Sequence, residues 1–271
     1  MDAYLVCHNG LGDNIYMVGA LNFIKQFYKN VFFLCKEKHY ENVKLLFDES
    51  SNIICLPFNE VNEYHTVYNI LIHKYNDNND IFVCGGCHTQ YLKSKITNKD
   101  FLNYKIIDKE YTLNYGPINN KNYSFIIDFY RDAKLNLTYF YEYFDLPNND
   151  VSKQLYESVK HYYLIFVQCI TSDNKTLNIS NLINKYKNDD KVLLICNDKN
   201  LYDKNDTQYV LAEQFVMNKI VYYVDVIKNS DEIYMIDSSF TGIVLPFIKT
   251  NRLKAKNVQI ILRDEVHNRI I

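Results

Sequence analysis

The chain has no tryptophan, only four prolines and seven glycines, and arginine at just four of its 271 positions. Lysine supplies most of the positive charge, and the formal net charge is −2 at pH 7. No overall basic field therefore attracts nucleic acid. No apolar run is as long as a membrane span, and the N-terminus lacks the basic region and apolar core of a secretory signal. We expect a protein with no nucleic-acid partner and no membrane span.

What the chain does contain is typical of a folded globular protein. It is 48% hydrophobic and 23% charged, and it is long enough for two ordinary domains or one large one. The seven cysteines are an odd number, and most of them stand inside apolar runs. This pattern predicts buried free thiols in a reducing compartment, so we expect a cytoplasmic protein.

The N-terminal stretch reads as strand, glycine-bearing loop and helix. Tyr4–Cys7 is a short apolar run of β character, His8–Gly12 is a tight loop, and Asn14–Tyr28 has apolar residues at helical spacing. An α/β nucleotide-binding sheet often begins in this way. The loop lacks the third glycine of the GxGxxG fingerprint, so it does not predict dinucleotide binding.

Asp13 follows this loop and has two interpretations. As the N-cap of the helix, its oxygen would accept the free N–H groups of the first turn. As a general base, it would stand at the carboxyl end of the first strand, where open α/β sheets bind ligands. The stretch by itself leaves both open.

The pattern of strand and helix continues along the first half of the chain. Predicted strands at Asn30–Cys35, Asn52–Leu56 (ending at Pro57) and Ile81–Cys84 alternate with predicted helices at Glu37–Phe47 and Tyr64–Tyr75. This order indicates a parallel, doubly wound sheet.

The middle of the chain is less regular. Residues 88–125 contain Gly116-Pro117 and an Asn-rich turn at 119–122, and they suggest irregular or strand structure. Phe125–Phe144 is aromatic and predicted to be helical. Leu146–Asp150, with a proline, two asparagines and an aspartate, is the best linker candidate.

A second alternating series follows the linker. The predicted strands are Tyr162–Gln168, Lys191–Cys196, Ile220–Tyr223, Glu232–Ile236 and Val258–Leu262, and the predicted helices are Leu177–Lys187, Gln208–Val216, Val224–Asn229 and Gly242–Lys249. The chain is therefore predicted to form two α/β domains, 1–148 and 149–271.

Two polar loops follow predicted strands of the second domain. Thr171–Lys175 offers hydroxyls and a lysine directly before a predicted helix, which favours a phosphate-binding site. Asp237–Gly242 is also rich in hydroxyls and enters a helix. Either loop can instead be a solvated turn or a helix cap. If their strands are neighbours, both loops converge on one crevice.

The run Cys84-Gly-Gly-Cys87-His88 contains a CxxC spacing that can indicate zinc or redox chemistry. No second CxxC or His pair accompanies it, which argues against a closed zinc site. We favour a structural turn, with a tight loop that brings His88 and Gln90 near an acceptor as the functional alternative.

These motifs together carry a resemblance. GLGDN followed by an amphipathic helix resembles the opening of the bacterial ADP-heptose:lipopolysaccharide heptosyltransferases and related GT-B glycosyltransferases. Thr171-Ser172 with Lys175 is similar to their hydroxyl-hydroxyl-Lys phosphate loop, and Asp237-Ser238-Ser239 resembles their Asp-Thr-Gly diphosphate loop. The chain departs from them in a shorter spacing to Lys175 and in lacking the His that follows the third motif.

The resemblance implies two Rossmann-like domains facing across a cleft, an N-terminal acceptor-side domain and a C-terminal nucleotide-sugar-binding domain. It implies an inverting glycosyltransferase, independent of metal and of any cofactor, that moves a sugar from a nucleotide-diphosphate donor to a glycan, glycoprotein or glycolipid acceptor. Asp13 is then the general base. The predicted donor-binding residues are Gly12, Thr171, Ser172, Lys175, Asp237, Ser238, Ser239, Thr241 and Gly242, and the predicted acceptor-binding residues are His88 and Gln90.

Two other functions remain open. One is a nucleotide-sugar epimerase or another transferase on the same scaffold. The other is a non-catalytic protein that binds a nucleotide sugar or a glycan and retains the fold.

Overall fold

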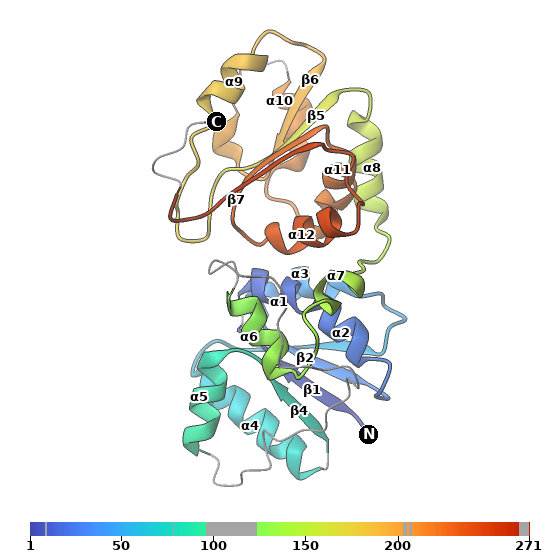
Figure 1. The fold of residues 1–271 in the computed structure, drawn as a ribbon, viewed down its shortest axis with the longest axis vertical. Helices are drawn as coiled ribbons and strands as arrows, with labels where there is room; N and C mark the ends of the chain where they lie inside the picture. The colour runs from blue at the N-terminus through green and yellow to red at the C-terminus, as the bar shows by residue number, and fades with distance from the viewer. Residues whose placement is uncertain (9, 78, 96–123, 203–204, 206–207, 266–270) are drawn as a thin grey trace. The chain divides into compact units, whose positions relative to one another are not determined.

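The computed structural model describes the chain except for residues 9, 78, 96–123, 203–204, 206–207 and 266–270. It contains two compact units, Met1–Pro147 and Asn148–Ile271. In each unit the described residues form a four-stranded sheet whose paired strands are all parallel, with helices around it. The predicted α/β class is confirmed (Figure 1).

The first unit begins with a strand, as expected. Its strands are β1 (Ala3–Val6), β2 (Val31–Lys36), β3 (Ile53–Phe58) and β4 (Asp80–Val83). Its helices are α1 (Leu11–Tyr16), α2 (Val18–Ile24), α3 (Tyr40–Val43), α4 (Glu63–Asn76), α5 (Gly86–Lys95), α6 (Ser124–Asp132) and α7 (Tyr139–Glu142), with 3₁₀ turns η1 (Glu37–His39) and η2 (Lys44–Leu46).

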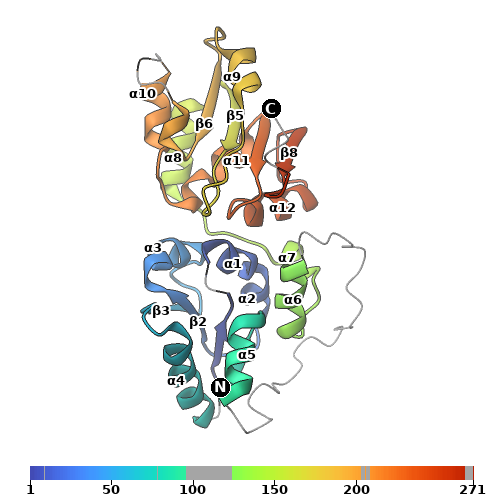
Figure 2. The same cartoon turned by 90° about the vertical axis from the view of Figure 1, so that its left-hand side faces the viewer.

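The strands of the first sheet lie in the order β3-β2-β1-β4. Side chains alternate between the two faces, so each face packs against different helices. Tyr4 and Val6 belong to a buried cluster with Val67 and Leu71 of α4 and Leu92 of α5. Figure 2 shows these two helices beside the sheet. Parallel sheets occur with helices covering both faces in this way.

The opposite face is covered by the segments that follow α2 and α3. Leu5, Phe33 and Phe82 stand side by side in the sheet register. Phe33 meets the ring of Phe47 edge-on at 6.1 Å, and Phe82 meets that of Tyr28 at 6.0 Å. Both faces of the sheet are therefore buried, which explains why the strands are nearly continuous hydrophobic runs.

The second unit is also a four-stranded sheet with helices around it, but its strands follow a different order. Its strands are β5 (Tyr163–Gln168), β6 (Val192–Cys196), β7 (Glu232–Ile236) and β8 (Asn257–Ile261). Its helices are α8 (Asp150–Val159), α9 (Ser180–Tyr186), α10 (Tyr209–Ala212), α11 (Val224–Asn229) and α12 (Thr241–Lys249), with 3₁₀ turns η5 (Lys199–Leu201), η6 (Glu213–Phe215) and η7 (Ile220–Tyr223).

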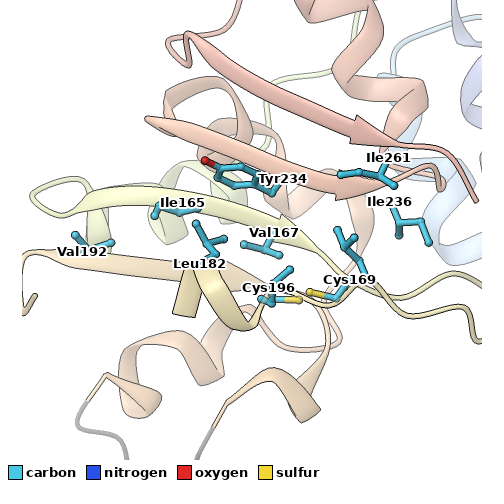
Figure 3. Close-up of a cluster of buried hydrophobic side chains, with 11 residues drawn as sticks. Ile165, Val167, Cys169, Leu182, Val192, Cys196, Tyr234, Ile236 and Ile261 are labelled. Atoms are coloured by element: carbon cyan, nitrogen blue, oxygen red, sulfur yellow. The ribbon is translucent and has the colours of Figure 1, made fainter. Parts of the chain in front are cut away.

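The second sheet has the order β6-β5-β7-β8. On one face, Ile165 and Val167 of β5 pack with Leu182 of α9 (Figure 3). On the other face, the Phe166 ring meets those of Tyr223 and Phe240 at 6.0 and 5.2 Å. Helices thus cover both faces, and the ends of the strands are where loops and polar side chains gather.

Two predicted elements of the first unit have the expected type but differ in continuity or bounds. The predicted helix at Glu37–Phe47 is the broken series η1, α3 and η2. Strand β3 continues through Pro57 to Phe58. Pro57 lacks a backbone N–H. It is tolerated because β3 is the edge strand, and no further strand pairs with its outer side.

The long aromatic stretch Phe125–Phe144 is two helices rather than one. Lys134 has a φ of 51°, and this left-handed residue follows the end of α6. Residues 88–95, expected to be irregular or strand, continue α5. The expected turns at Gly116-Pro117 and 119–122 lie outside the described residues.

In the second unit, helix α8 was not predicted. It begins where the Asn149 side chain accepts the N–H of Ser152 at 3.0 Å.

In the same unit, Ile220–Tyr223 is a 3₁₀ turn rather than a strand. The β-branched and aromatic residues at 220–223 have strand propensity, but packing overrides it. The Tyr223 hydroxyl lies within hydrogen-bond distance of two acceptors, Asn197 Oδ1 at 2.8 Å and the carbonyl of Phe215, and its one hydrogen can be donated to either of them.

The predicted first helix, Asn14–Tyr28, begins earlier and is interrupted at Met17. Tyr130 of α6 stabilises the interruption, because its hydroxyl accepts the N–H of Ala20 and donates to the carbonyl of Tyr16, both at 3.1 Å. A helix break with its backbone groups satisfied in this way is part of the native structure.

Gly19 provides a test of this packing. An added Cβ there would lie closer than 3.0 Å to the backbone oxygen of Tyr139 and 3.1 Å from the Tyr130 hydroxyl. We expect Gly19→Ala to lower the free energy of unfolding by about 2–3 kcal/mol, because the close approach of α7 to α2 must open. Urea denaturation measures the change.

The matched control is Gly86→Ala at the start of α5, where an added Cβ has nothing within 4 Å. It should change the free energy of unfolding by less than about 0.5 kcal/mol. Equal stabilities of the two variants would show that α7 does not pack on α2 as described.

Candidate functional site

Each sheet contains a point at which the direction of strand addition reverses. In the first unit the chain moves outward from β1 to β2 and β3, then returns to place β4 on the other side of β1. In the second unit it moves from β5 to β6, then returns to β7 beside β5. Open α/β sheets bind ligands outside the carboxyl ends of the strands at such a point. The loops after β1 and β4, and after β5 and β7, are therefore the candidate sites.

Asp13 lies in the first turn of α1, at the reversal point of the first sheet. The N-cap is Gly10, and Asp13 is the third residue of the helix, so the prediction of Asp13 as the N-cap was wrong in position. Its Oδ2 instead accepts the N–H of Gly10 at 3.1 Å, as in a capping box. This contact holds the carboxylate at the helix N-terminus, beside the loop after β1.

The loops after β1 and β4 contact each other closely. Gly85 has a φ of +91°, and a Cβ there would lie 2.7 Å from His8 Cδ2. The N–H of Gly85 donates to Asp132 Oδ2 at 2.8 Å. The His8 ring also meets Phe129 edge-on at 5.4 Å. Gly85 is thus required both by its backbone conformation and by His8.

His88 and Gln90, the predicted acceptor residues, lie on α5 rather than in a loop, because the helix begins at Gly86. His88 is 2% exposed, and its Nε2 lies 3.2 Å from Glu63 Oε1. Glu63 also pairs with Lys36 Nζ at 2.7 Å. Gln90 is exposed. The buried His88 side chain thus contacts Glu63. Its role in contacting an acceptor stays a prediction.

Burial lowers the pKa of His88 from its ordinary 6.5, and the nearby charges of His8 and Lys36 lower it further. The charge and hydrogen bond of Glu63 oppose this shift without reversing it. The neutral imidazole is therefore the prevailing form at pH 7.

Of the two cysteines of the CxxC run, the structure describes the side chain of Cys84. Within the described residues, no group of three or more His, Cys, Asp and Glu side chains is placed to hold a metal ion. Cys84 is buried and free, and burial raises the pKa of its thiol well above the ordinary value. Cys84 is thus an unreactive core residue, as the structural interpretation predicts.

The loop after β5 differs from the sequence expectation. Thr171–Lys175 does not lead directly into a helix, because Ile170 and Thr176 form an antiparallel bridge and α9 begins only at Ser180. The prediction of a phosphate at a helix N-terminus was therefore wrong for this loop. Thr171 is buried and organises the turn. Its Oγ1 accepts the N–H of Lys175 at 3.0 Å and donates to the carboxylate of Asp173.

The loop after β7 is shaped by Thr241, which is buried at the start of α12. Its Oγ1 accepts the N–H of Ser238 at 3.1 Å. Burial raises the pKa of Asp237 above its ordinary 3.8, while the hydrogen bond from Thr241 and the charge of Arg263 oppose the shift. Ser239 is half-buried and Gly242 is buried in the first turn of α12. Thr241 and Gly242 thus form the frame of the loop.

Two buried polar atoms at this end of the second sheet have no hydrogen-bond partner among the described residues. They are Oγ of Ser238 and Oε1 of Gln168, the last residue of β5. Gln168 uses its amide to donate to the carbonyl of Ile170 at 2.7 Å. Buried polar groups in folded proteins are nearly always paired, so these two atoms mark a place for a polar ligand or water.

The predicted loops do converge. Strands β5 and β7 are parallel neighbours in register, so Thr171, Ser172 and Lys175 leave the sheet beside Asp237, Ser238 and Ser239. Gly12, the remaining predicted donor-binding residue, belongs to α1 of the first unit.

Arg263 joins these two loops and was not singled out from the sequence. It follows β8, and its Nε donates to the carbonyl of Asp237 at 2.9 Å. Its Nη1 lies 3.8 Å from Asp173 Oδ1. Lys175 Nζ in turn lies 3.4 Å from both the carbonyl of Arg263 and Asp264 Oδ1. The only available sequence signal was the rarity of arginine in this chain.

Comparison with solved structures identifies the fold. The structure is similar to a glycosyl transferase family 9 protein from Veillonella parvula, with a TM-score of 0.54 at 10% identity, covering 99% of this chain and 90% of that one. It is also similar to E. coli ADP-heptose LPS heptosyltransferase II, with a TM-score of 0.56 at 9% identity, covering 96% and 90%. The chain therefore has the GT-B fold of these enzymes, as the sequence resemblance predicted.

Sequence comparison adds nothing to this, since no protein-family model and no curated protein matches the chain. No described helix is long and apolar enough to cross a membrane.

The geometry of the second unit suits an anion. Hydroxyl groups, loop N–H groups and two cations gather at the reversal point of its sheet, where they can neutralise a phosphate. The first unit places carboxylates and histidines at the corresponding point, which suits proton transfer and the binding of hydroxyl groups.

Proposed function

We propose that the protein is a glycosyltransferase that moves a sugar, with inversion, from a nucleotide-diphosphate donor to a hydroxyl group of a glycan, glycoprotein or glycolipid. The observation that carries the proposal is the position of the two hydroxyl-rich loops at the reversal point of the second sheet, in a chain with the GT-B fold. The free, buried thiols favour a reducing compartment such as the cytoplasm.

In this proposal the second unit binds the donor. Ser172, Lys175, Ser238 and Ser239 stabilise the negative charge that develops on the departing nucleotide diphosphate. Asp237 orients the loop through Arg263 and Thr241. These groups neutralise the diphosphate without a metal ion.

The first unit supplies the base. As the acceptor hydroxyl forms a bond to the anomeric carbon, the bond from that carbon to the diphosphate oxygen breaks, and Asp13 takes the hydroxyl proton. The helix N-terminus and the Gly10 N–H hold the Asp13 carboxylate in one orientation, so it need not be ordered during the reaction.

A thermal-shift screen against ADP-, UDP-, GDP-, CMP- and dTDP-sugars tests donor binding. A ligand present at 100 times its dissociation constant should add about 2.7 kcal/mol of apparent stability. The donor found in this way is then incubated with acceptors, and release of the nucleotide is measured. A chain that binds the donor but releases nothing with any acceptor is a binding protein, and one that converts the donor sugar without an acceptor is an epimerase.

Lys175→Ala tests the proposed phosphate loop. The variant should weaken binding of the nucleoside diphosphate by roughly 1.5–3 kcal/mol, the size of a hydrogen bond to a charged group. Calorimetric titration measures the affinity. The control is Lys187→Ala, an exposed lysine at the end of α9, which should bind like the wild type. Equal affinity of Lys175→Ala and wild type would remove Lys175 from the site.

A further inference from the structure

We propose that Arg263 is the residue of the second unit that selects a diphosphate over a monophosphate, by binding two phosphoryl oxygens at once. This inference rests on the proposed donor site and deepens it. It assigns a specificity residue on the segment after β8, outside the two loops that the sequence indicated.

The Arg263 guanidinium is fixed at one side. Its Nε donates to the carbonyl of Asp237 at 2.9 Å, and Asp237 is itself tied to β8, because its N–H donates to the carbonyl of Ile261 at 2.8 Å. A guanidinium carries five N–H donors in a rigid plane. With the Nε–H used, the orientation of the plane is set, and the terminal nitrogens project from the β7 loop toward the β5 loop.

On the side of the β5 loop, the partner of the terminal nitrogens among the described residues is a weak one. Nη1 lies 3.8 Å from Asp173 Oδ1, and the two side chains are 41% and 48% exposed. An ion pair of this length and exposure contributes little to stability. The Asp173 carboxylate therefore occupies an anion position that a phosphate, with more charge and more acceptor oxygens, takes over readily.

Lys175 of the β5 loop contacts the backbone of Arg263, since its ammonium lies 3.4 Å from the Arg263 carbonyl. Lys175 and Arg263 thus both lie where the segments after β5, β7 and β8 meet. An independent observation points to a ligand at this end of the sheet, because two buried atoms, Oγ of Ser238 in the loop that Arg263 holds and Oε1 of Gln168 at the end of β5, have no hydrogen-bond partner among the residues that the structure describes.

The two cations have different chemistry. The ammonium of Lys175 is a compact point charge, while the planar fork of Arg263 matches two oxygens of a phosphate or of adjacent phosphates. A diphosphate presents oxygens on two phosphorus atoms and gains from both contacts. A monophosphate can pair with Lys175 but makes fewer hydrogen bonds to the Arg263 guanidinium. Arg263 should therefore discriminate between diphosphates and monophosphates.

The experiment measures the affinities of the full chain for inorganic pyrophosphate, inorganic phosphate, and the nucleoside mono- and diphosphate found in the thermal-shift screen. In the wild type, the diphosphates should bind more tightly than the monophosphates. Arg263→Gln should weaken binding of both diphosphates about 10–100-fold and of the monophosphates less than 5-fold. The matched control is Arg252→Gln, whose guanidinium lies beyond α12 on the Phe247 ring, and which should leave every affinity unchanged.

Two further variants separate a role in binding from a role in holding the loop. Arg263→Lys retains the charge without the fork, so the diphosphates should bind about 5-fold more weakly while monophosphates are unaffected. Asp173→Asn removes the competing charge but leaves an oxygen for Thr171, so the diphosphates should bind about 3-fold more tightly. A melting temperature that Arg263→Gln lowers by more than Arg252→Gln does indicates a disturbed loop. In that case the affinities of Arg263→Lys and Asp173→Asn decide whether Arg263 binds the diphosphate.

The outcomes separate this inference from the proposed function. Wild-type selectivity that persists in Arg263→Gln and Arg263→Lys overturns the role of Arg263 and leaves the donor site in place. A wild-type chain that binds neither pyrophosphate nor any nucleotide overturns both.

Discussion

Replacing Asp13 with Asn should reduce the rate of sugar transfer about 1,000-fold, within the range found for the loss of a general base. The affinity for the nucleotide donor should not change, because the proposed donor contacts belong to the second unit. Asn retains an oxygen that can accept the Gly10 N–H, a contact of 3.1 Å in the wild type, so α1 should start at the same residue. Single-turnover transfer and calorimetric binding of the nucleoside diphosphate measure the two effects.

Asp48→Asn is the matched control for this variant. Asp48 lies on the surface of the same unit and accepts the N–H of Ser50 at 2.8 Å, a local contact of the same kind. Its replacement should leave transfer unchanged. Asp13→Ala adds the loss of the helix contact, and it should lower stability by about 1 kcal/mol as well as activity. Normal turnover in Asp13→Asn would leave Asp13 with only its structural role at the helix N-terminus.

Replacing Glu232 with Ala should lower the free energy of unfolding by about 3 kcal/mol, because three tyrosine hydroxyls lose a charged hydrogen-bond acceptor. Glu232 is 7% exposed at the start of β7. Its Oε1 accepts the hydroxyl groups of Tyr163 and Tyr186 at 2.9 and 2.8 Å, and its Oε2 accepts that of Tyr234. These three tyrosines belong to β5, α9 and β7, so one carboxylate joins three elements. Urea denaturation at pH 7 measures the loss.

The control for Glu232 is Glu157→Ala. Glu157 pairs with Lys160 at 2.6 Å on the exposed side of α8, where its side chain is 58% exposed. Such a pair contributes less than about 1 kcal/mol. Similar losses for the two variants would mean that the tyrosine hydroxyls do not depend on Glu232.

The same network predicts a dependence on pH. Burial alone would raise the pKa of Glu232, but the hydrogen bonds from Tyr234, Tyr186 and Tyr163 outweigh it and hold the pKa below its ordinary 4.5. The charged form is thus favoured by folding. Its contribution is complete above the ordinary pKa and disappears as the pH falls through the lowered value of the folded state. The stability difference between wild type and Glu232→Gln should therefore shrink below about pH 4.

Part of the fold follows from local pattern. The strand at Glu232–Ile236 and the helix at Val224–Asn229 have the predicted bounds. Within this strand, Ile233–Ile236 is an apolar run with a β-branched residue at each end, and polar residues flank it, so the signal is unambiguous. The alternation of strands and helices likewise determines that the sheets are parallel, because a helix is needed to cross between parallel neighbours.

The errors have a common cause. Ile220–Tyr223 and Phe125–Phe144 have residues that suit strand and helix, respectively, but both adopt what their tertiary contacts require. Tyr223 is held by Phe215 and Asn197, and α6 ends at a left-handed Lys134. Propensities differ by only a fraction of a kcal/mol per residue, so a few buried contacts reverse them.

The candidate site, too, was predicted in part from local pattern and depends in part on tertiary contacts. The residue types of the loops at 171–175 and 237–242 were sufficient to predict an anion site, because hydroxyls and lysine after apolar strands have few other uses in combination. That the two loops are neighbours depends on the strand order β6-β5-β7-β8. Order in a sheet is set by which hydrophobic faces pack together, and no local pattern states it.

By itself, the sequence determined the α/β class, the two units, the hydroxyl-rich loops and the carboxylate at residue 13. Only the tertiary structure decided that Asp13 is the third residue of α1, that His88 is buried against Glu63, and that Arg263 lies over both loops of the second unit. The reason is physical. Local patterns report what one segment prefers, whereas the positions of His88 and Arg263 depend on contacts between segments separated by tens of residues along the chain.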